Sequence, residues 1–440
     1  MSHESILIQQ ANFFQNQHMV QGDILIKDHK ILKIAPSLAK HAEHIIPAQH
    51  FFLMPGVIDP HVHFRDPGLC HKEDLESGSK AAAAGGVTSF FDMPNTLPNT
   101  DTCEHMAEKK AIAAQKSLIN YNFFMAATHD NLSELIRAEN IAGIKIYVGS
   151  STGNLLVNQP EILENIFAQS NKLIAVHSED ETTIIANQNK YLPNDDPKTH
   201  LKIRSKEAAI TCTNMLLKLA KTHQSRLHIC HLTTAEEAQL IQKAQLSNVS
   251  CEATVQHLHL DDSLYDQIGP FAQLNPPIRD KANAQALQNA LKTGIINCLA
   301  SDHSPHTKKE KSQRFGKAPS GIPSVETQLP VMLNQVQKKN YTLQQLQQWF
   351  CHAPAQLFNI HNKGFLKEGY DADLTLIDLK KSKILQENHL YCKAKWSPYS
   401  GQKLTGWPLI TLVNGHIVFQ EGDFFDEIKG KEIYISQKSH

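Results

Sequence analysis

The middle of the chain repeats one pattern: a short apolar run that ends at polar residues, then a longer stretch with helical spacing of its apolar positions. Runs typical of buried β-strands occur eight times, at 56–64, 87–93, 121–127, 143–148, 173–177, 226–231, 249–255 and 295–301. Helical stretches lie between most of them, for example at 73–84, 104–116, 161–169, 206–221, 235–244 and 282–291. Eight strands alternating with helices predict an α/β fold, a (β/α)8 TIM barrel, over residues 55–364.

The two ends of the chain have a different pattern, typical of short β-strands. Near the N-terminus, apolar runs at 5–10, 23–26 and 31–34 are separated by polar turns. Near the C-terminus, residues 372–378 alternate, and 409–419 contains Asn414-Gly415, a pair favoured in tight hairpin turns. We therefore expect residues 1–54 and 365–440 to form one small β-sandwich domain beside the barrel.

Composition narrows the class of protein. Among 440 residues, 43 Lys and Arg nearly balance 44 Asp and Glu, which argues against a nucleic-acid-binding surface. No apolar stretch reaches the ~18 residues of a membrane span, and the first residues lack the pattern of a secretion signal. The 8 cysteines are scattered without a C-x-x-C pair, which favours a reducing compartment, the cytoplasm.

The first predicted strand ends with His61-Val62-His63, at the barrel end where catalytic residues are expected. Alternate residues of a strand point the same way, so both imidazoles can reach one metal ion. Since the chain has 25 histidines, such pairs also arise by chance, and His257-Leu258-His259 is another. A structural role for the pair therefore stays open.

Three further strand ends carry possible metal ligands. The fifth strand ends at His177, the sixth at His231, and the eighth at Asp302, next to His303. Each has a structural explanation, such as a buried histidine or a helix-capping aspartate. The agreement of four strand ends favours a catalytic site for zinc or a similar divalent ion, because its ligands are imidazoles and carboxylates without a thiolate.

Lys145 lies in the fourth predicted strand, on the same face as Tyr147. A lysine that points into a barrel mouth is costly unless it is paired or modified. One explanation is a buried ion pair with a carboxylate. The other is a lysine carbamylated by CO2, which carries a carboxylate and could bridge two metals.

Several stretches resemble one known family. They are PGVIDPHVHFRDPG (55–68), MPNT (93–96), GIKIY (143–147), NPPIR (275–279), SDHSPH (301–306) and, near the C-terminus, WSPYSGQKLTGWP and LVNGHIVF. Over nearly the whole chain they resemble the dihydroorotases of the amidohydrolase superfamily. His-x-His marks only the superfamily, whereas HFRDPG together with MPNT is much more specific.

The resemblance implies roles for particular residues. Two Zn²⁺ ions are implied, the first bound by His61, His63 and Asp302, the second by His177 and His231, with carbamylated Lys145 as the bridge. Arg65 would pair with the substrate carboxylate, since a planar guanidinium suits bidentate contact. The substrate site would be completed by Asn95, Asn275, His306 and the backbone near Gly321.

The implied reaction is the reversible cyclisation of N-carbamoyl-L-aspartate to L-dihydroorotate in de novo pyrimidine biosynthesis. A metal-bridging hydroxide would attack the ring amide, with Asp302 as general acid/base. The family often has Pro-His-His-Leu after the seventh strand, where this chain has Val255-Gln256-His257-Leu258. We therefore assign no role to His257 or His259. A homodimer is an expectation that comes from the family alone.

Two alternatives remain. Another cyclic amidohydrolase, a hydantoinase (dihydropyrimidinase) or an allantoinase, would share the metals but would not require Arg65. An inactive dihydroorotase-like scaffold subunit, for example for a transcarbamoylase, would be expected to lack ligands that this chain has. The charged segment 307–319 is read as a solvated loop, with a substrate-closing lid as the alternative.

Overall fold

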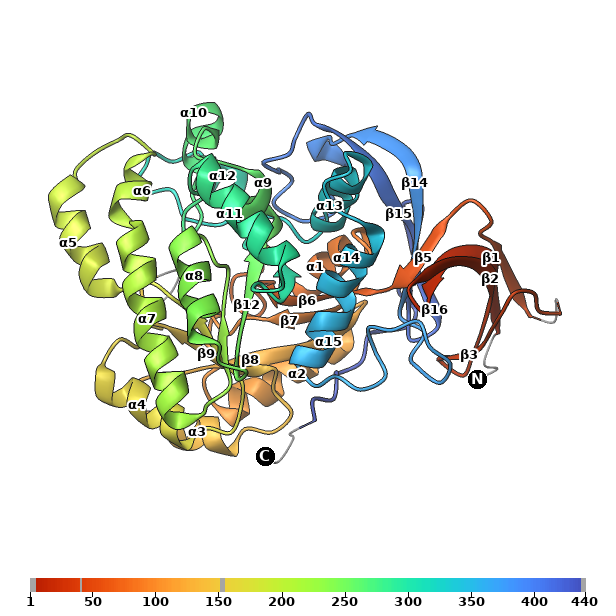
Figure 1. Ribbon diagram of the computed structural model, residues 1–440, viewed down its shortest axis with the longest axis horizontal. Coiled ribbons are helices and arrows are strands. Elements are labelled where there is room, and N and C mark those ends of the chain that lie inside the picture. Colours follow the sequence, from red (N-terminus) through yellow and green to blue (C-terminus); the bar gives the residue numbers. More distant parts are fainter. Residues whose placement is uncertain (1–4, 40–41, 151–154, 437–440) are drawn as a thin grey trace.

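An eight-stranded parallel sheet forms the larger part of the computed structural model, which describes residues 5–39, 42–150 and 155–436 (Figure 1). Its strands follow one another in chain order. They are β6 (Val57–Val62), β7 (Val87–Asp92), β8 (Asn120–Ala126), β9 (Gly143–Tyr147), β10 (Ile174–His177), β11 (Leu227–Ile229), β12 (Val249–Thr254) and β13 (Cys298–Ala300). The backbone N of His63 donates to the carbonyl of His303 at 2.8 Å, which joins the last strand end to the first. The predicted (β/α)8 barrel is confirmed.

Helices surround the barrel and connect its strands. They are α1 (Leu75–Ala84), α2 (Cys103–Lys116), α3 (Leu132–Arg137), α4 (Pro160–Gln169), α5 (Glu181–Tyr191), α6 (Thr199–Ile203), α7 (Lys206–His223), α8 (Ala235–Ala244), α9 (Val255–His259), α10 (Leu264–Ile268), α11 (Lys281–Lys292), α12 (Lys308–Lys311), α13 (Gln328–Gln337), α14 (Leu343–Gln347) and α15 (Ala353–Leu357). The six predicted helical stretches correspond to α1, α2, α4, α7, α8 and α11. Helix α5 was not predicted, because it buries only Glu181 and Ile184 and so lacks an apolar stripe.

The barrel strands are apolar on both faces because both faces are covered. Every residue of β6, β7, β8, β9 and β10 is buried. Side chains on one face fill the barrel and those on the other pack against helices, as in parallel sheets generally. Polar side chains at the carboxyl ends of the strands are therefore the exceptions that need a chemical explanation.

The terminal strands form a separate mixed sheet of nine strands, at the right of Figure 1. These are β1 (Ile6–Gln15), β2 (His18–Lys27), β3 (Lys30–Ala35), β4 (His44–Pro47), β5 (Phe52–Pro55), β14 (Leu374–Ile384), β15 (Lys403–Val413), β16 (His416–Gln420) and β17 (Asp423–Phe424). Strand β5 pairs with β1 on one side and with β14 on the other, which joins the two ends of the chain. Asn414 (φ 49°) and Gly415 (φ 78°) form the predicted turn between β15 and β16.

After β17 the chain returns to the barrel. The backbone N of Ile433 donates to the carbonyl of Tyr121 in β8 at 2.8 Å. The Ile433 side chain is buried in an apolar cluster with Phe91, Phe124 and Phe358. The C-terminal segment is thus packed against the barrel. Within the described ranges, no helix combines the length and the apolar character that crossing a membrane requires.

Candidate active site

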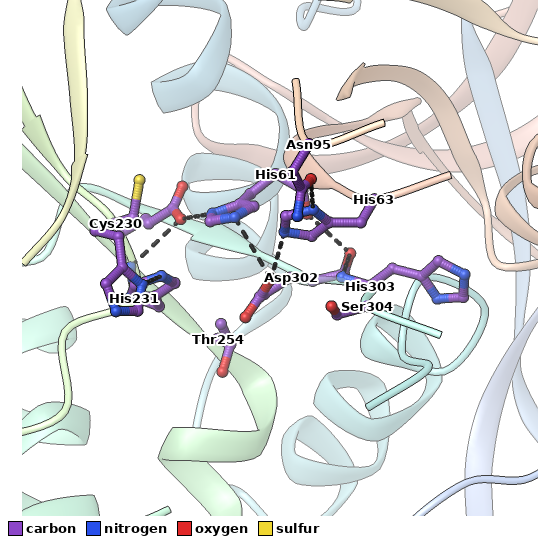
Figure 2. Close-up of polar contacts among 12 residues, drawn as sticks. His61, His63, Asn95, Cys230, His231, Thr254, Asp302, His303 and Ser304 are labelled. Atoms are coloured by element: carbon purple, nitrogen blue, oxygen red, sulfur yellow. Dashed lines mark hydrogen bonds and ion pairs between the residues drawn. The ribbon is translucent and has the colours of Figure 1, made fainter. Parts of the chain in front are cut away.

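A small cavity lies at the carboxyl ends of the barrel strands, and all six predicted metal-binding residues line it. The lining consists of His61, His63, Lys145, Tyr147, His177, His231, Leu274, Asn275, Asp302, Ser304, Ser320 and Gly321. Figure 2 shows His61 and His63 pointing toward Asp302, with His231 at the left of the view. The strand ends that were predicted to converge do converge.

Left-handed backbone conformations mark the ends of three strands. Arg65 has φ 63°, His231 has φ 37° and Asp302 has φ 44°. Positive φ is unfavourable for residues with a Cβ atom and persists where the surroundings impose it, often at functional sites. The turns after β6, β11 and β13 therefore carry strain next to the cavity.

His61, His63 and Asp302 form one group of possible ligands. Nε2 of His61 lies 3.4 Å from Oδ1 of Asp302, and Nε2 of His63 lies 3.3 Å from the same oxygen. Two atoms bound at about 2.0–2.2 Å to one tetrahedral zinc are about 3.3–3.5 Å apart. One ligand atom from each of these three buried side chains lies within 4.8 Å of the other two. The group fits a divalent ion without rearrangement.

His177 and His231 form a second group. Nδ1 of His177 and Nε2 of His231 lie 3.2 Å apart, again close to the ligand spacing in a tetrahedral site. The His61 and His231 ring centres are 5.3 Å apart, so the two groups are adjacent. Nδ1 of His231 is buried and has no hydrogen-bond partner among the described residues.

Hydrogen-bond acceptors outside the cavity orient three of these histidines. Nδ1 of His61 bonds Oε1 of Glu252 at 2.5 Å, and Nε2 of His177 bonds Oε2 of Glu179 at 2.7 Å. Nδ1 of His63 bonds Oδ1 of Asn95 at 2.6 Å. Each contact leaves the other ring nitrogen facing the cavity, as in carboxylate–histidine–metal arrangements.

Sequence reasoning missed Glu252 and Glu179. Asn95 is predicted to contact substrate, which stays a prediction, and its side chain also holds His63. Glu252 is a charged residue inside the buried strand β12, and Glu179 is two residues after His177. Glu252 could have been identified from the sequence, because a carboxylate within an otherwise apolar buried strand is unusual.

Burial sets the protonation of the site. It lowers the pKa of His61, His63, His177 and His231, so their imidazoles are neutral near pH 7, the form that binds metals. Burial also raises the pKa of Asp302, although His61 and Lys145 oppose that shift.

Lys145 is 1% exposed and has no ion pair with any carboxylate in the part of the chain that the structure describes. Its Nζ lies 3.0 Å from Sγ of Cys230 and 5.2 Å from the centre of the Tyr147 ring. Its charge acts on His61 of the first group and on His177 of the second. The buried Lys–carboxylate pair considered above is therefore not what the structure contains.

Some of the predicted substrate residues line the cavity and others lie behind its lining. Asn275 lines it, and its buried Oδ1 has no hydrogen-bond partner among the described residues. Gly321 lines it with φ +146°, and a Cβ there would lie 2.3 Å from the Ser304 carbonyl. Arg65 and His306 reach the lining through single contacts: Arg65 Nη2 donates to Ser304 Oγ at 2.8 Å, and His306 Nε2 bonds the Ser320 carbonyl at 3.0 Å.

Two further sequence interpretations can be compared with the structure. His257, to which the sequence assigned no role, bonds Oγ1 of Thr254 at 2.8 Å and the carbonyl of Pro276 at 3.0 Å, which are structural contacts. The solvated-loop interpretation of 307–319 holds for Lys308 and Lys309, which are exposed. It is wrong for Lys311, whose side chain is fully buried, because its amine bonds two backbone carbonyls.

Comparison with known proteins agrees with this geometry. The family model described as "Amidohydrolase family" matches residues 52–418. Among solved structures, an L-hydantoinase (dihydropyrimidinase) from Arthrobacter aurescens superposes with a TM-score of 0.93 at 29% identity, over 98% of this chain and 100% of that chain. A dihydropyrimidinase from Brevibacillus agri has a TM-score of 0.92 at 26% identity, over 99% and 100%.

Curated relatives are more similar in sequence. A dihydroorotase of Methanosphaera stadtmanae is 35% identical over 416 residues, which is 93% of this chain and 94% of that protein. A dihydroorotase of Pyrococcus furiosus is 32% identical over 97% of this chain and 96% of that protein. The chain therefore belongs to the amidohydrolase family, and its curated relatives place it among the dihydroorotases of that family.

Proposed function

We propose that the chain is a dihydroorotase that interconverts N-carbamoyl-L-aspartate and L-dihydroorotate. The observation that carries this choice is the buried guanidinium of Arg65, which bonds Ser304 in the cavity lining. Both substrates carry a carboxylate that a guanidinium binds well, whereas an uncharged hydantoin ring needs no such group. The buried Arg65 therefore favours a substrate with a carboxylate over the uncharged ring of a hydantoin, although the fold resembles that of hydantoinases.

Zn²⁺ is the proposed cofactor, at two positions. His61, His63 and Asp302 would hold one ion, and His177 and His231 the other, as their ligand-atom spacings support. Lys145, as a carbamate, would supply the carboxylate between them. When bound, the ions would polarise the amide carbonyl and make a water nucleophilic near neutral pH.

The chain's own residues then orient substrate and move a proton. Asp302 accepts a proton from the attacking water and returns it to the departing ring nitrogen. Burial raises the pKa of Asp302 above the usual value of a carboxyl group, which makes its carboxylate a stronger base for this exchange. Arg65 fixes the substrate carboxylate. The buried Oδ1 of Asn275, which has no hydrogen-bond partner among the described residues, accepts from a substrate N–H. The eight free cysteines support a reducing compartment, in keeping with the cytoplasm.

The test is hydrolysis of dihydroorotate by the metal-loaded protein at alkaline pH, with hydantoin, dihydrouracil and allantoin as competitors. We expect kcat/KM for dihydroorotate to exceed the others by about 100-fold or more, because only dihydroorotate satisfies Arg65. Preference for hydantoin or allantoin would assign another cyclic amidohydrolase. Absence of any ring opening would favour the scaffold alternative.

Lys145→Ala tests the bridge. We expect this variant to lose most bound metal and activity, and the mass of the unchanged protein to include one CO2 adduct at Lys145. A variant with full metal content and full rate would contradict a bridging role.

A further inference from the structure

Lys311, the last residue of α12, has a fully buried side chain. Its Nζ donates to the carbonyl of Gln273 at 3.1 Å and to that of Pro319 at 2.9 Å. Each carbonyl immediately precedes a segment of the cavity lining: Leu274 and Asn275 follow Gln273, and Ser320 and Gly321 follow Pro319. One amine therefore ties together the two segments of this cavity wall.

The wall has little freedom to adjust. The Gln273 carbonyl also accepts a hydrogen bond from the backbone N of Gly321 at 2.9 Å, so the segments are joined directly as well as through Lys311. At Gly321 a Cβ would approach the Ser304 carbonyl to 2.3 Å. A shift of Gln273 would thus displace both Gly321 and Asn275, two residues further along the chain.

Trp396 connects Lys311 to the predicted substrate residue His306. The Lys311 amine lies 5.7 Å from the centre of the Trp396 ring, which packs edge-on against Phe271 at 5.1 Å. Indole Nε1 of Trp396 donates to the His306 carbonyl at 2.9 Å. The segment that carries Trp396 lies between strands β14 and β15 of the terminal sheet.

The burial of Lys311 is not explained by charge pairing. Burial lowers its pKa to about 7, and no charged group in the described part of the chain offsets that shift. Lysine is rarely buried without a partner, and an apolar side chain of similar length would fill this space without desolvation. The amine keeps at least two N–H groups in either protonation state, enough for both carbonyls.

We propose that Lys311 is a positioning residue for substrate binding, which braces the wall containing Asn275 and Gly321 and, through Trp396, supports His306. This inference rests on the proposed function, because the ligand that the wall would contact is dihydroorotate or N-carbamoyl-L-aspartate. Lys311 itself does not line the cavity, so its effect is through the geometry of residues that do.

Lys311→Met removes both hydrogen bonds and keeps an apolar stem, while Lys309→Met changes an exposed lysine of the same helix. In the metal-loaded, full-length protein we expect KM for dihydroorotate to rise about tenfold in Lys311→Met, with kcat within about threefold and bound metal unchanged. Lys309→Met should keep the KM of the unchanged protein. An unchanged KM in Lys311→Met, or a loss confined to kcat, would overturn the inference.

If Lys311→Met does not fold, Trp396→Phe carries the kinetic test. It keeps an aromatic ring beside Lys311 but removes the donor to the His306 carbonyl. We expect its KM for dihydroorotate to rise about threefold with kcat retained, and an unchanged KM would contradict the support of His306 through Trp396.

Tryptic cleavage after Arg314, whose side chain is 67% exposed, gives a measurement that does not depend on activity. Each methionine variant loses one tryptic site in this loop, so the two are matched. Cleavage should be faster in Lys311→Met than in Lys309→Met, and equal rates would overturn the positioning role of Lys311. If the unchanged protein does not turn over dihydroorotate, the proposed function fails, whereas this comparison still decides whether Lys311 holds the loop.

Discussion

Arg65 combines three properties at the scale of a single residue: its side chain is 2% exposed, its backbone has φ 63° and its guanidinium faces Ser304. Burial lowers the pKa of Arg65, and the nearby Asp92 and Asp302 oppose that shift, so the group stays charged. A buried guanidinium next to the cavity lining suits the substrate carboxylate that we propose it binds. Nε of Arg65 has no partner among the described residues.

Arg65→Ala should therefore reduce kcat/KM for dihydroorotate by at least about 100-fold, about 3 kcal/mol, which is typical of a lost buried charge-assisted contact. Bound metal should be largely retained, because the direct contacts of the Arg65 side chain within the described residues are with Ser304 and His306 and not with a proposed ligand. Arg137→Ala is the control, since the Arg137 side chain is 69% exposed. Undiminished turnover in Arg65→Ala would refute the choice of substrate.

Glu252 joins His61 to a second buried histidine, His228, whose Nε2 lies 3.1 Å from Oε2. Glu252→Gln should weaken metal binding by about 10–100-fold, measured by titrating the metal-free protein, because the amide is a poorer acceptor for the His61 N–H. The surface pair His223–Glu164, at 2.7 Å, offers a matched control in Glu164→Gln. Equal metal affinity in the two variants would contradict an orienting role for Glu252.

At the scale of elements, the barrel strands could be predicted because burial on both faces gives each strand a continuous apolar run. Their order follows from the chain, so the strand ends that carry His61, His177, His231 and Asp302 could be placed together in advance. Contacts between side chains of strands that are distant in the chain could not be predicted. Glu252 in β12 meets His61 in β6 only because of the radius and tilt of the closed barrel, which a one-dimensional pattern does not encode.

Loops were the other limit of sequence reasoning. Lys311 stands in a run of charged residues that predicts a solvated loop, and its burial is explained by contacts with distant residues, above all the carbonyls of Gln273 and Pro319. Helix α5 has too few buried positions to show periodicity. The burial of Lys311 and the formation of helix α5 both depend on residues that are distant in the chain and pack against these segments.

Glu326 couples two elements and gives a pH-dependent prediction. It precedes α13, is 9% exposed, and accepts the backbone N–H of Tyr391 at 2.8 Å, and burial raises its pKa from 4.5 to about 8. The folded state thus binds a proton that the unfolded state releases above pH 4.5. The stability that this proton contributes is complete below that pH and is lost as pH rises through about 8.

Glu326→Gln, which is neutral at every pH, should therefore raise Tm by about 2–4 °C near pH 8 and by less than about 1 °C near pH 5. Thermal unfolding followed by circular dichroism measures this difference. Glu421→Gln removes a carboxylate that is 61% exposed and should show no such trend. A Tm difference that does not change with pH would contradict the assignment.

At the scale of the whole molecule, the C-terminal segment packs against the barrel far from the cavity. Ile433 is 1% exposed, whereas its neighbour Tyr434 is 69% exposed. Ile433→Ala should lower the free energy of unfolding by about 2–4 kcal/mol, as is typical of a buried isoleucine, while Tyr434→Ala should change it by about 0.5 kcal/mol or less. Denaturant unfolding measures both, and KM should be unchanged in each. Equal effects would mean that the segment does not contribute to the core.

The barrel closes between His63 and His303, where the backbone N of one residue bonds the carbonyl of the other. Two proposed ligands of the same ion, His63 and Asp302, lie on opposite sides of this seam. The two sides are 240 residues apart in the chain, as in the contact of Ser301 Oγ with the His61 carbonyl, so the first side is synthesised well before the second. The candidate site therefore cannot form until both sides of this seam have been synthesised, and an ion bound by His63 and Asp302 would hold the two sides together.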